Sequence, residues 1–150
     1  MERSELEELE TLYIFTPAPG DTWGLTFTRL KQLLLELDPE AFFRVEDPRE
    51  EVPGGGPFMF FEAALGDGDI EGVAKREPEG VAVQNCTAGR AAEFVRWLLC
   101  SGAVPKGRII TFNTAWGAES ELPDTVVPDV PESGLVEVFL AHVVQTGGLD

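Results

Sequence analysis

Between residues 41 and 84, short apolar segments alternate with compact turn signals, and this alternation constrains the fold more than any other feature of the sequence. Each segment is four to nine residues long and contains the aromatic or β-branched side chains that are typical of strands. The Asp67-Gly68 pair suits a tight turn, and residues 77–80 have proline second and glycine fourth, as in a type I turn. Turns this short join antiparallel strands, because a parallel pair needs a crossover of a dozen or more residues. We therefore predict a four-stranded antiparallel meander with strands at residues 41–46, 57–65, 70–76 and 81–84.

Three other segments have apolar residues at helical spacing. The first covers residues 25–37. The second follows Thr87, a suitable N-cap, and ends before Gly102, a residue that commonly ends helices. The third, residues 135–144, is ambiguous, because its apolar residues recur every four positions but many of them are β-branched. We favour a helix there, since the segment is ten residues long and two glycines follow it closely.

The sequence as a whole predicts an α+β fold. Two more strands are expected, at residues 11–16 and 108–113. The sheet is then mainly antiparallel, with about six strands and the meander at its centre, and two or three amphipathic helices pack on one of its faces. We expect a single domain over residues 1–150, because 150 residues fit one hydrophobic core.

Three segments are expected to lie outside these elements. Residues 1–10 are predicted to form a frayed helical segment, in which Ser4 and Glu7 have the spacing of a capping box. Residues 48–56, with three consecutive glycines, are expected to be a solvent-exposed loop. Residues 114–134 contain three prolines and are expected to be a second, long loop.

The chain is strongly acidic, with 27 Asp and Glu residues against 11 Lys and Arg residues and a formal net charge of −16. Contact with phosphate requires clustered Lys and Arg, so we expect no binding to nucleic acid or to an anionic membrane. The apolar runs are only a few residues long, against the ~20 that a membrane-spanning helix needs. The charge therefore favours a basic partner.

The two cysteines, Cys86 and Cys100, flank the helix predicted after Thr87. A helix of about 13 residues separates its ends by ~20 Å, whereas a disulfide needs Cα atoms within ~7 Å. We therefore expect two unpaired thiols. Because the N-terminus also has no basic and apolar regions of a secretion signal, we expect the protein to be cytoplasmic.

The charge is uneven along the chain, since residues 111–150 contain seven acidic side chains and no lysine or arginine. One interpretation is that these acidic side chains are simply solvated. The other is that carboxylates beside an exposed indole attract and dock a basic partner. A Trp-Gly pair outside any periodic face is either buried sideways or exposed for contact, and Trp23-Gly24 is the second such pair. The predicted partner-binding residues are Trp116, Glu119, Glu121, Asp124 and Asp129.

Other chemistry has weaker support. The single histidine and two cysteines have no zinc-ligand spacing, so no metal site is predicted. Residues 67–72 resemble the start of a calcium loop, but Pro78 stands where that loop needs a glutamate. No cofactor motif is present, so no cofactor is predicted. Thiol chemistry remains an alternative, because Cys86 precedes a helix N-terminus, where the dipole lowers a thiol pKa, and His142 is an available base.

Two main functional hypotheses follow, besides the possibility of a structural subunit whose acidic loops are incidental. The first is a non-enzymatic acidic domain that binds a basic protein partner, such as a toxin or nuclease, and inhibits it by covering its cationic cleft. Bacterial immunity proteins share this size and acidity, which is an analogy of physical type without a matching motif. The alternative is a small-molecule-binding or enzymatic α+β domain with a pocket near Cys86 and His142.

Overall fold

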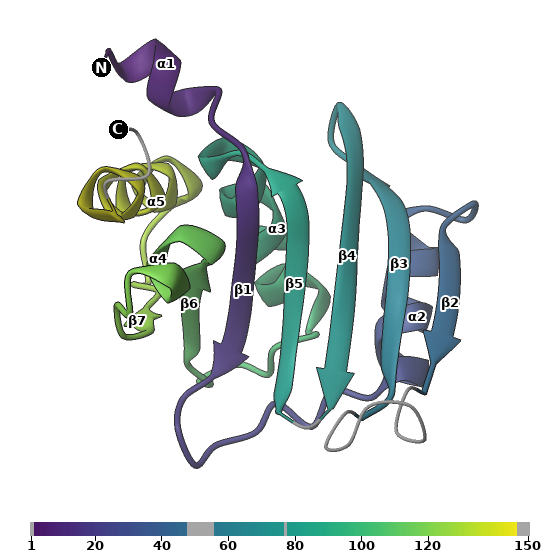
Figure 1. The fold of residues 1–150 in the computed structure, drawn as a ribbon. Coiled ribbons are helices and arrows are strands. Elements are labelled where there is room, and N and C mark those ends of the chain that lie inside the picture. The colour runs from purple at the N-terminus through teal and green to yellow at the C-terminus, as the bar shows by residue number, and fades with distance from the viewer. Residues whose placement is uncertain (1, 48–55, 77, 147–150) are drawn as a thin grey trace.

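The computed structural model describes residues 2–47, 56–76 and 78–146 and shows an α+β fold built on one antiparallel sheet (Figure 1). The helices of the described residues are α1 (Arg3–Glu7), α2 (Phe27–Leu37), α3 (Ala88–Ser101), α4 (Ala115–Glu119) and α5 (Glu132–Thr146). The strands are β1 (Thr11–Pro17), β2 (Phe42–Glu46), β3 (Phe58–Leu65), β4 (Gly68–Arg76), β5 (Glu79–Cys86), β6 (Ile110–Thr114) and β7 (Thr125–Val126).

The strand order β2-β3-β4-β5-β1-β6-β7 confirms the predicted meander, in which β2 to β5 are consecutive neighbours. The sheet has seven strands, and the one beyond the predicted six is the two-residue β7. In the β3–β4 hairpin Leu65 pairs with Gly68, so the turn residues are Gly66 and Asp67, one position before the predicted pair. Gly66 explains the shift, because its φ of 62° lies in the left-handed region that favours glycine. The predicted turn at residues 77–80 includes Glu77, which lies outside the described residues.

The core lies between one face of the sheet and the three longer helices, α2, α3 and α5. Phe94 of α3 lies 5.9 Å from the ring of Phe15 on β1 and 6.4 Å from that of Phe61 on β3. Phe139 of α5 lies 4.8 Å from Phe112 on β6 and forms edge contacts with the β1 aromatic residues. These fully buried rings fix α3 and α5 to the central strands.

Local sequence signals place the main helices well. Thr87 caps α3 by accepting a hydrogen bond from the Arg90 N–H at 3.2 Å, and Gly102 ends it with a φ of 84°. The ambiguous segment after residue 134 is helical, as α5, and buries Leu135 and Phe139. No helix among the described residues is both long and apolar enough to cross a membrane.

The helical segment predicted within residues 1–10 is present as α1, but its capping box and the long loop predicted at residues 114–134 need correction. The capping box is wrong, because α1 begins at Arg3 after Glu2, which makes no side-chain capping bond, and Ser4 lies inside the helix. Arg3 forms one exposed ion pair with Glu7 within α1 and a second with Glu137 of α5. Residues 114–134 are not a continuous loop, because they include α4 and β7. The predicted loop at residues 48–56 lies outside the described residues except for Gly56.

Candidate protein-binding surface

A small buried polar cluster fixes the position of α4. The Thr114 side-chain oxygen accepts a hydrogen bond from the Gly117 N–H at 3.0 Å and lies 2.9 Å from His142 Nε2. The Asn113 side-chain oxygen accepts from the Thr114 N–H at 2.9 Å. A Cβ at position 117 would lie 2.0 Å from Asn113 Oδ1 and 3.0 Å from the His142 ring, so this close approach requires glycine. The Trp116-Gly117 pair is therefore on a tightly docked helix and not in a loop.

The end of α4 has the hydrogen bonds of a Schellman motif. The Leu122 N–H donates to the Gly117 carbonyl at 2.9 Å, and the Glu121 N–H donates to the Ala118 carbonyl at 3.1 Å. Glu121 occupies the left-handed position of this motif with a φ of 59°, where glycine is the usual residue.

Four of the five predicted binding residues lie on α4 or in the segment that follows it. Trp116 and Glu119 belong to α4, and Glu121 and Asp124 come before β7. Trp116 is partly buried, whereas the carboxylates are exposed. Asp129 lies elsewhere, because it lines a surface hollow together with Arg96 of α3, Val130, Pro131 and Glu132.

The exposed carboxylates differ in whether the protein itself uses them. Asp124 accepts a hydrogen bond from Asn113 Nδ2 at 3.1 Å, which ties this segment to β6. The side chains of Glu119, Glu121 and Asp129 make no hydrogen bond or ion pair with any other described residue. Glu119 and Glu121 are therefore left without an ion-pair partner among the described residues, whereas Asp129 shares its hollow with the cation Arg96.

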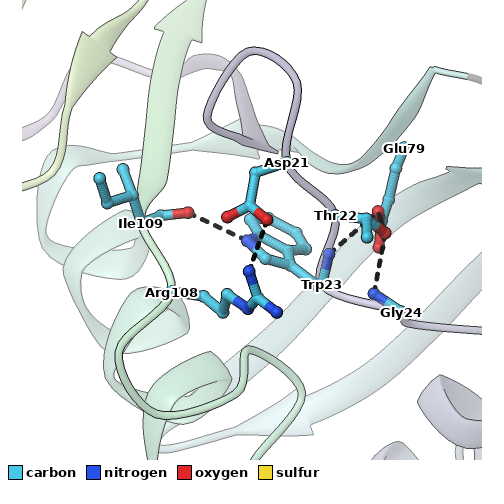
Figure 2. A network of polar contacts seen from close by, with 7 residues as sticks. All are labelled: Asp21, Thr22, Trp23, Gly24, Glu79, Arg108 and Ile109. Carbon is cyan, nitrogen blue, oxygen red and sulfur yellow. Dashed lines mark hydrogen bonds and ion pairs between the residues drawn. The ribbon is translucent and has the colours of Figure 1, made fainter.

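The second Trp-Gly pair has the opposite environment, as Figure 2 shows. Trp23 is 4% exposed, and its indole Nε1 donates to the Ile109 carbonyl at 3.0 Å. The Glu79 carboxylate accepts hydrogen bonds from the Thr22 hydroxyl and from the Trp23 and Leu25 backbone N–H groups. Trp23 is a core residue, so it is not available for contact with a partner.

Two of the basic side chains between residues 90 and 108 form ion pairs with nearby carboxylates. Arg90 pairs with Glu93 at 3.0 Å, and Arg108 pairs with Asp21 at 2.7 Å beside Trp23 (Figure 2). Arg96 is exposed and makes no ion pair with a described residue. None of these three cations forms an ion pair with a predicted binding residue in the described part of the chain, and Arg96 lines the hollow beside Asp129.

Cys86 and His142, the residues of the alternative hypothesis, are both buried, and each makes a polar contact with a neighbouring group. Burial raises the pKa of the Cys86 thiol to about 12, and its Sγ donates to the Thr87 carbonyl at 3.3 Å. The thiol therefore stays protonated at neutral pH, which disfavours nucleophilic chemistry. Burial lowers the pKa of His142, whose Nε2 is engaged with Thr114. Neither residue lines the hollow beside Asp129, and neither lines a second hollow formed by Leu12, Ile14, Val73 and Ala82 on the sheet.

Comparison of the chain with family models, with curated proteins and with solved structures finds no match. Asn113 and Thr114 are not among the predicted binding residues, yet they determine where α4 lies. Thr114 is a threonine directly before a short helix, which is a readable N-cap signal in the sequence.

Proposed function

We propose that this chain is an acidic, non-enzymatic domain that binds a basic protein partner through α4 and the segment that follows it. The observation that carries the proposal is the absence of internal counter-charges for Glu119 and Glu121 beside the partly buried Trp116, within the described residues. Exposed carboxylates accelerate encounter with a cationic protein, and an indole supplies contact area at the centre of an interface. Asp124, in the segment after α4, adds to this negative surface, and Asp129 contributes a further exposed carboxylate in the separate hollow that it shares with Arg96.

The class of partner that fits best is a toxin or nuclease with a cationic substrate cleft. Such a cleft binds phosphate through clustered Lys and Arg, and the same cations pair with carboxylates of an inhibitor. Binding there covers the cleft and inhibits the partner, as in an immunity or antitoxin protein. We place this interaction in the cytoplasm, where the free thiols of Cys86 and Cys100 stay reduced.

The test uses two variants with equal changes in charge. The surface variant combines Glu119→Gln, Glu121→Gln, Asp124→Asn and Asp129→Asn. The control variant neutralises four exposed carboxylates elsewhere on the molecule, through Glu8→Gln, Glu36→Gln, Glu40→Gln and Asp67→Asn. The two variants therefore separate a local surface from net charge alone.

Each purified protein is immobilised and used to capture proteins from a lysate of the source cells, and the captured proteins are identified by mass spectrometry. We expect the native chain and the control variant to retain a basic protein that the surface variant loses. The captured protein is then purified and assayed for nuclease activity with and without the native chain, which is expected to inhibit it. Equal retention by the surface variant, or retention of acidic and neutral proteins only, would contradict the proposal.

A further inference from the structure

The sheet face opposite the three long helices carries a continuous apolar row. The strand register places Phe60 opposite Val73, Val73 opposite Ala82 and Ala82 opposite Ile14, so the row crosses β3, β4, β5 and β1. All four side chains alternate with buried core residues and are partly exposed. No helix of the described residues lies over this part of the sheet (Figure 1).

Part of this row forms a groove of about 400 Å³. Its walls come from Leu12 and Ile14 on β1, Val73 on β4 and Ala82 on β5, with Gln84 and Lys75 among the polar side chains at its edges. An antiparallel sheet usually has polar side chains on its solvated face, so an apolar groove at this position is a candidate contact surface.

The charges beside the row indicate what the groove accepts. Glu62 of β3 lies directly opposite Glu71 of β4 on the same face, next to Phe60 and Val73. Carboxylates in directly opposed positions repel each other. Glu71 accepts a hydrogen bond from Gln84 at 2.7 Å, but neither carboxylate has an ion pair with a described residue.

The two cations considered on this face, Lys75 and Arg44, do not form an ion pair with Glu62 or Glu71. Lys75 lies on the other side of the apolar row, opposite Phe58, and Arg44 pairs with Glu46 at 2.7 Å while its guanidinium lies over the Phe60 ring. The Glu62–Glu71 pair therefore offers a place for a cation supplied from outside. A second copy of the chain is a poor occupant, because each copy has a net charge of −16.

We propose that the open sheet face binds an amphipathic helix of the basic partner, with its apolar stripe along Ile14, Ala82, Val73 and Phe60 and a lysine or arginine at Glu62 and Glu71. Four neighbouring strands span ~14 Å at about 4.8 Å per strand, which a helix of about ten residues covers at ~1.5 Å rise. This is the general mode in which a helix is recognised through anchors at positions i, i+4 and i+7. The inference rests on the proposed function for the charge of the partner, but it places the contact on a different surface from α4.

The probe is a synthetic 14-residue peptide with leucines at positions i, i+4 and i+7 on one face, lysines flanking them and alanines elsewhere. A scrambled peptide of the same composition, which lacks the apolar stripe, is its control. Binding to the full chain is measured by calorimetry, and the contacted amides are mapped by NMR chemical-shift changes. We expect changes on β1, β4 and β5, and at least tenfold weaker binding of the scrambled peptide.

The decisive variant is Val73→Glu, because it adds a negative charge to the groove. Attraction by charge alone would strengthen binding of the cationic peptide, whereas docking on the apolar row predicts at least tenfold weaker binding. Ala82→Glu repeats the test if thermal unfolding shows that the first variant is not folded. Unchanged or stronger binding to the folded variant, or equal binding of the scrambled peptide, would overturn the inference.

Two matched double variants separate this surface from α4. Glu62→Gln with Glu71→Gln should weaken peptide binding severalfold, and Glu119→Gln with Glu121→Gln should change it less than twofold. The reverse result would overturn the inference and leave the proposed function of α4 standing. A concentration-dependent dimer in sedimentation experiments that Val73→Glu abolishes would show a second copy on this face, which would also overturn it.

Discussion

The two Trp-Gly pairs of this chain, Trp23-Gly24 and Trp116-Gly117, have the same local sequence and opposite environments. Trp23 is buried, and the Glu79 carboxylate accepts three hydrogen bonds from residues 22–25, the segment that contains Trp23. The nearby Asp21 is neutralised by an ion pair with Arg108. Trp116 is partly buried on a five-residue helix, beside carboxylates that have no counter-charge among the described residues. The first region uses Glu79 and Asp21 internally, whereas in the second Asp124 accepts a hydrogen bond from Asn113 and the exposed Glu119 and Glu121 have no partner among the described residues.

The two regions also differ in which residues occupy the left-handed backbone positions. In the Trp23 region the left-handed positions are occupied by glycines, Gly20 with a φ of 79° and Gly24 with a φ of 69°. In the Trp116 region Glu121, a residue with a side chain, occupies such a position. The first region is built for stability, whereas the second accepts strain and unneutralised charge, a combination more frequent at functional sites.

The largest expected contrast is between the tryptophans themselves. Trp23→Ala should lower the free energy of unfolding by about 3–5 kcal/mol, because it removes a fully packed indole. Trp116→Ala should lower it by only about 1–2 kcal/mol, because that side chain is partly exposed already. Urea denaturation of both variants measures the difference. Losses of equal size would show that both tryptophans are core residues.

The next contrast compares carboxylates. Glu79→Gln should lower the free energy of unfolding by about 2 kcal/mol, because three hydrogen bonds lose a charged acceptor and an amide nitrogen faces their donors. Glu119→Gln should change it by less than about 0.5 kcal/mol, since the side chain is exposed and unpaired among the described residues. The same denaturation experiment tests both, and a comparable loss from Glu119→Gln would remove the distinction between the regions.

A pH-dependent contrast follows from His142, which anchors α4. Burial lowers its pKa in the folded protein, so below about pH 6.5 the unfolded chain binds a proton that the folded chain does not. The free energy of unfolding should therefore fall with decreasing pH by up to about 1.4 kcal/mol per unit relative to a His142→Gln variant. Denaturation of both proteins between pH 7.5 and 5.5 measures this difference. If the difference in the free energy of unfolding between the two proteins does not change with pH, or changes in the opposite direction, the result would contradict a buried, neutral imidazole.

The smallest expected effect is a gain. Glu121→Gly should raise the free energy of unfolding by about 1 kcal/mol, because glycine adopts the left-handed position without strain. Ser120→Gly, at a neighbouring residue with an ordinary φ of −87°, should lower it slightly and serves as the control. If Glu121→Gly is neutral or destabilising in thermal unfolding, position 121 is not strained.

Elements that depend on local signals could be predicted from the sequence, and elements that depend on distant partners could not. Thr87 and Gly102 mark the ends of α3 in the sequence and do so in the structure. By contrast, α4 is too short for any periodicity, and although Thr114 is a readable N-cap, the histidine that holds it lies 28 positions later. The burial of Trp23 likewise depends on a glutamate 56 positions away. Neither contact leaves a signal in the residues next to it.

The central claim is that the carboxylates around Trp116 attract a cationic protein, and the dependence of its binding on salt tests this most directly. The association constant of the captured partner is measured across a tenfold range of ionic strength for the native chain, the surface variant and the control variant. We predict a steep loss of affinity with salt for the native chain and the control variant, and a clearly shallower slope for the surface variant. Identical slopes for all three proteins would contradict the claim.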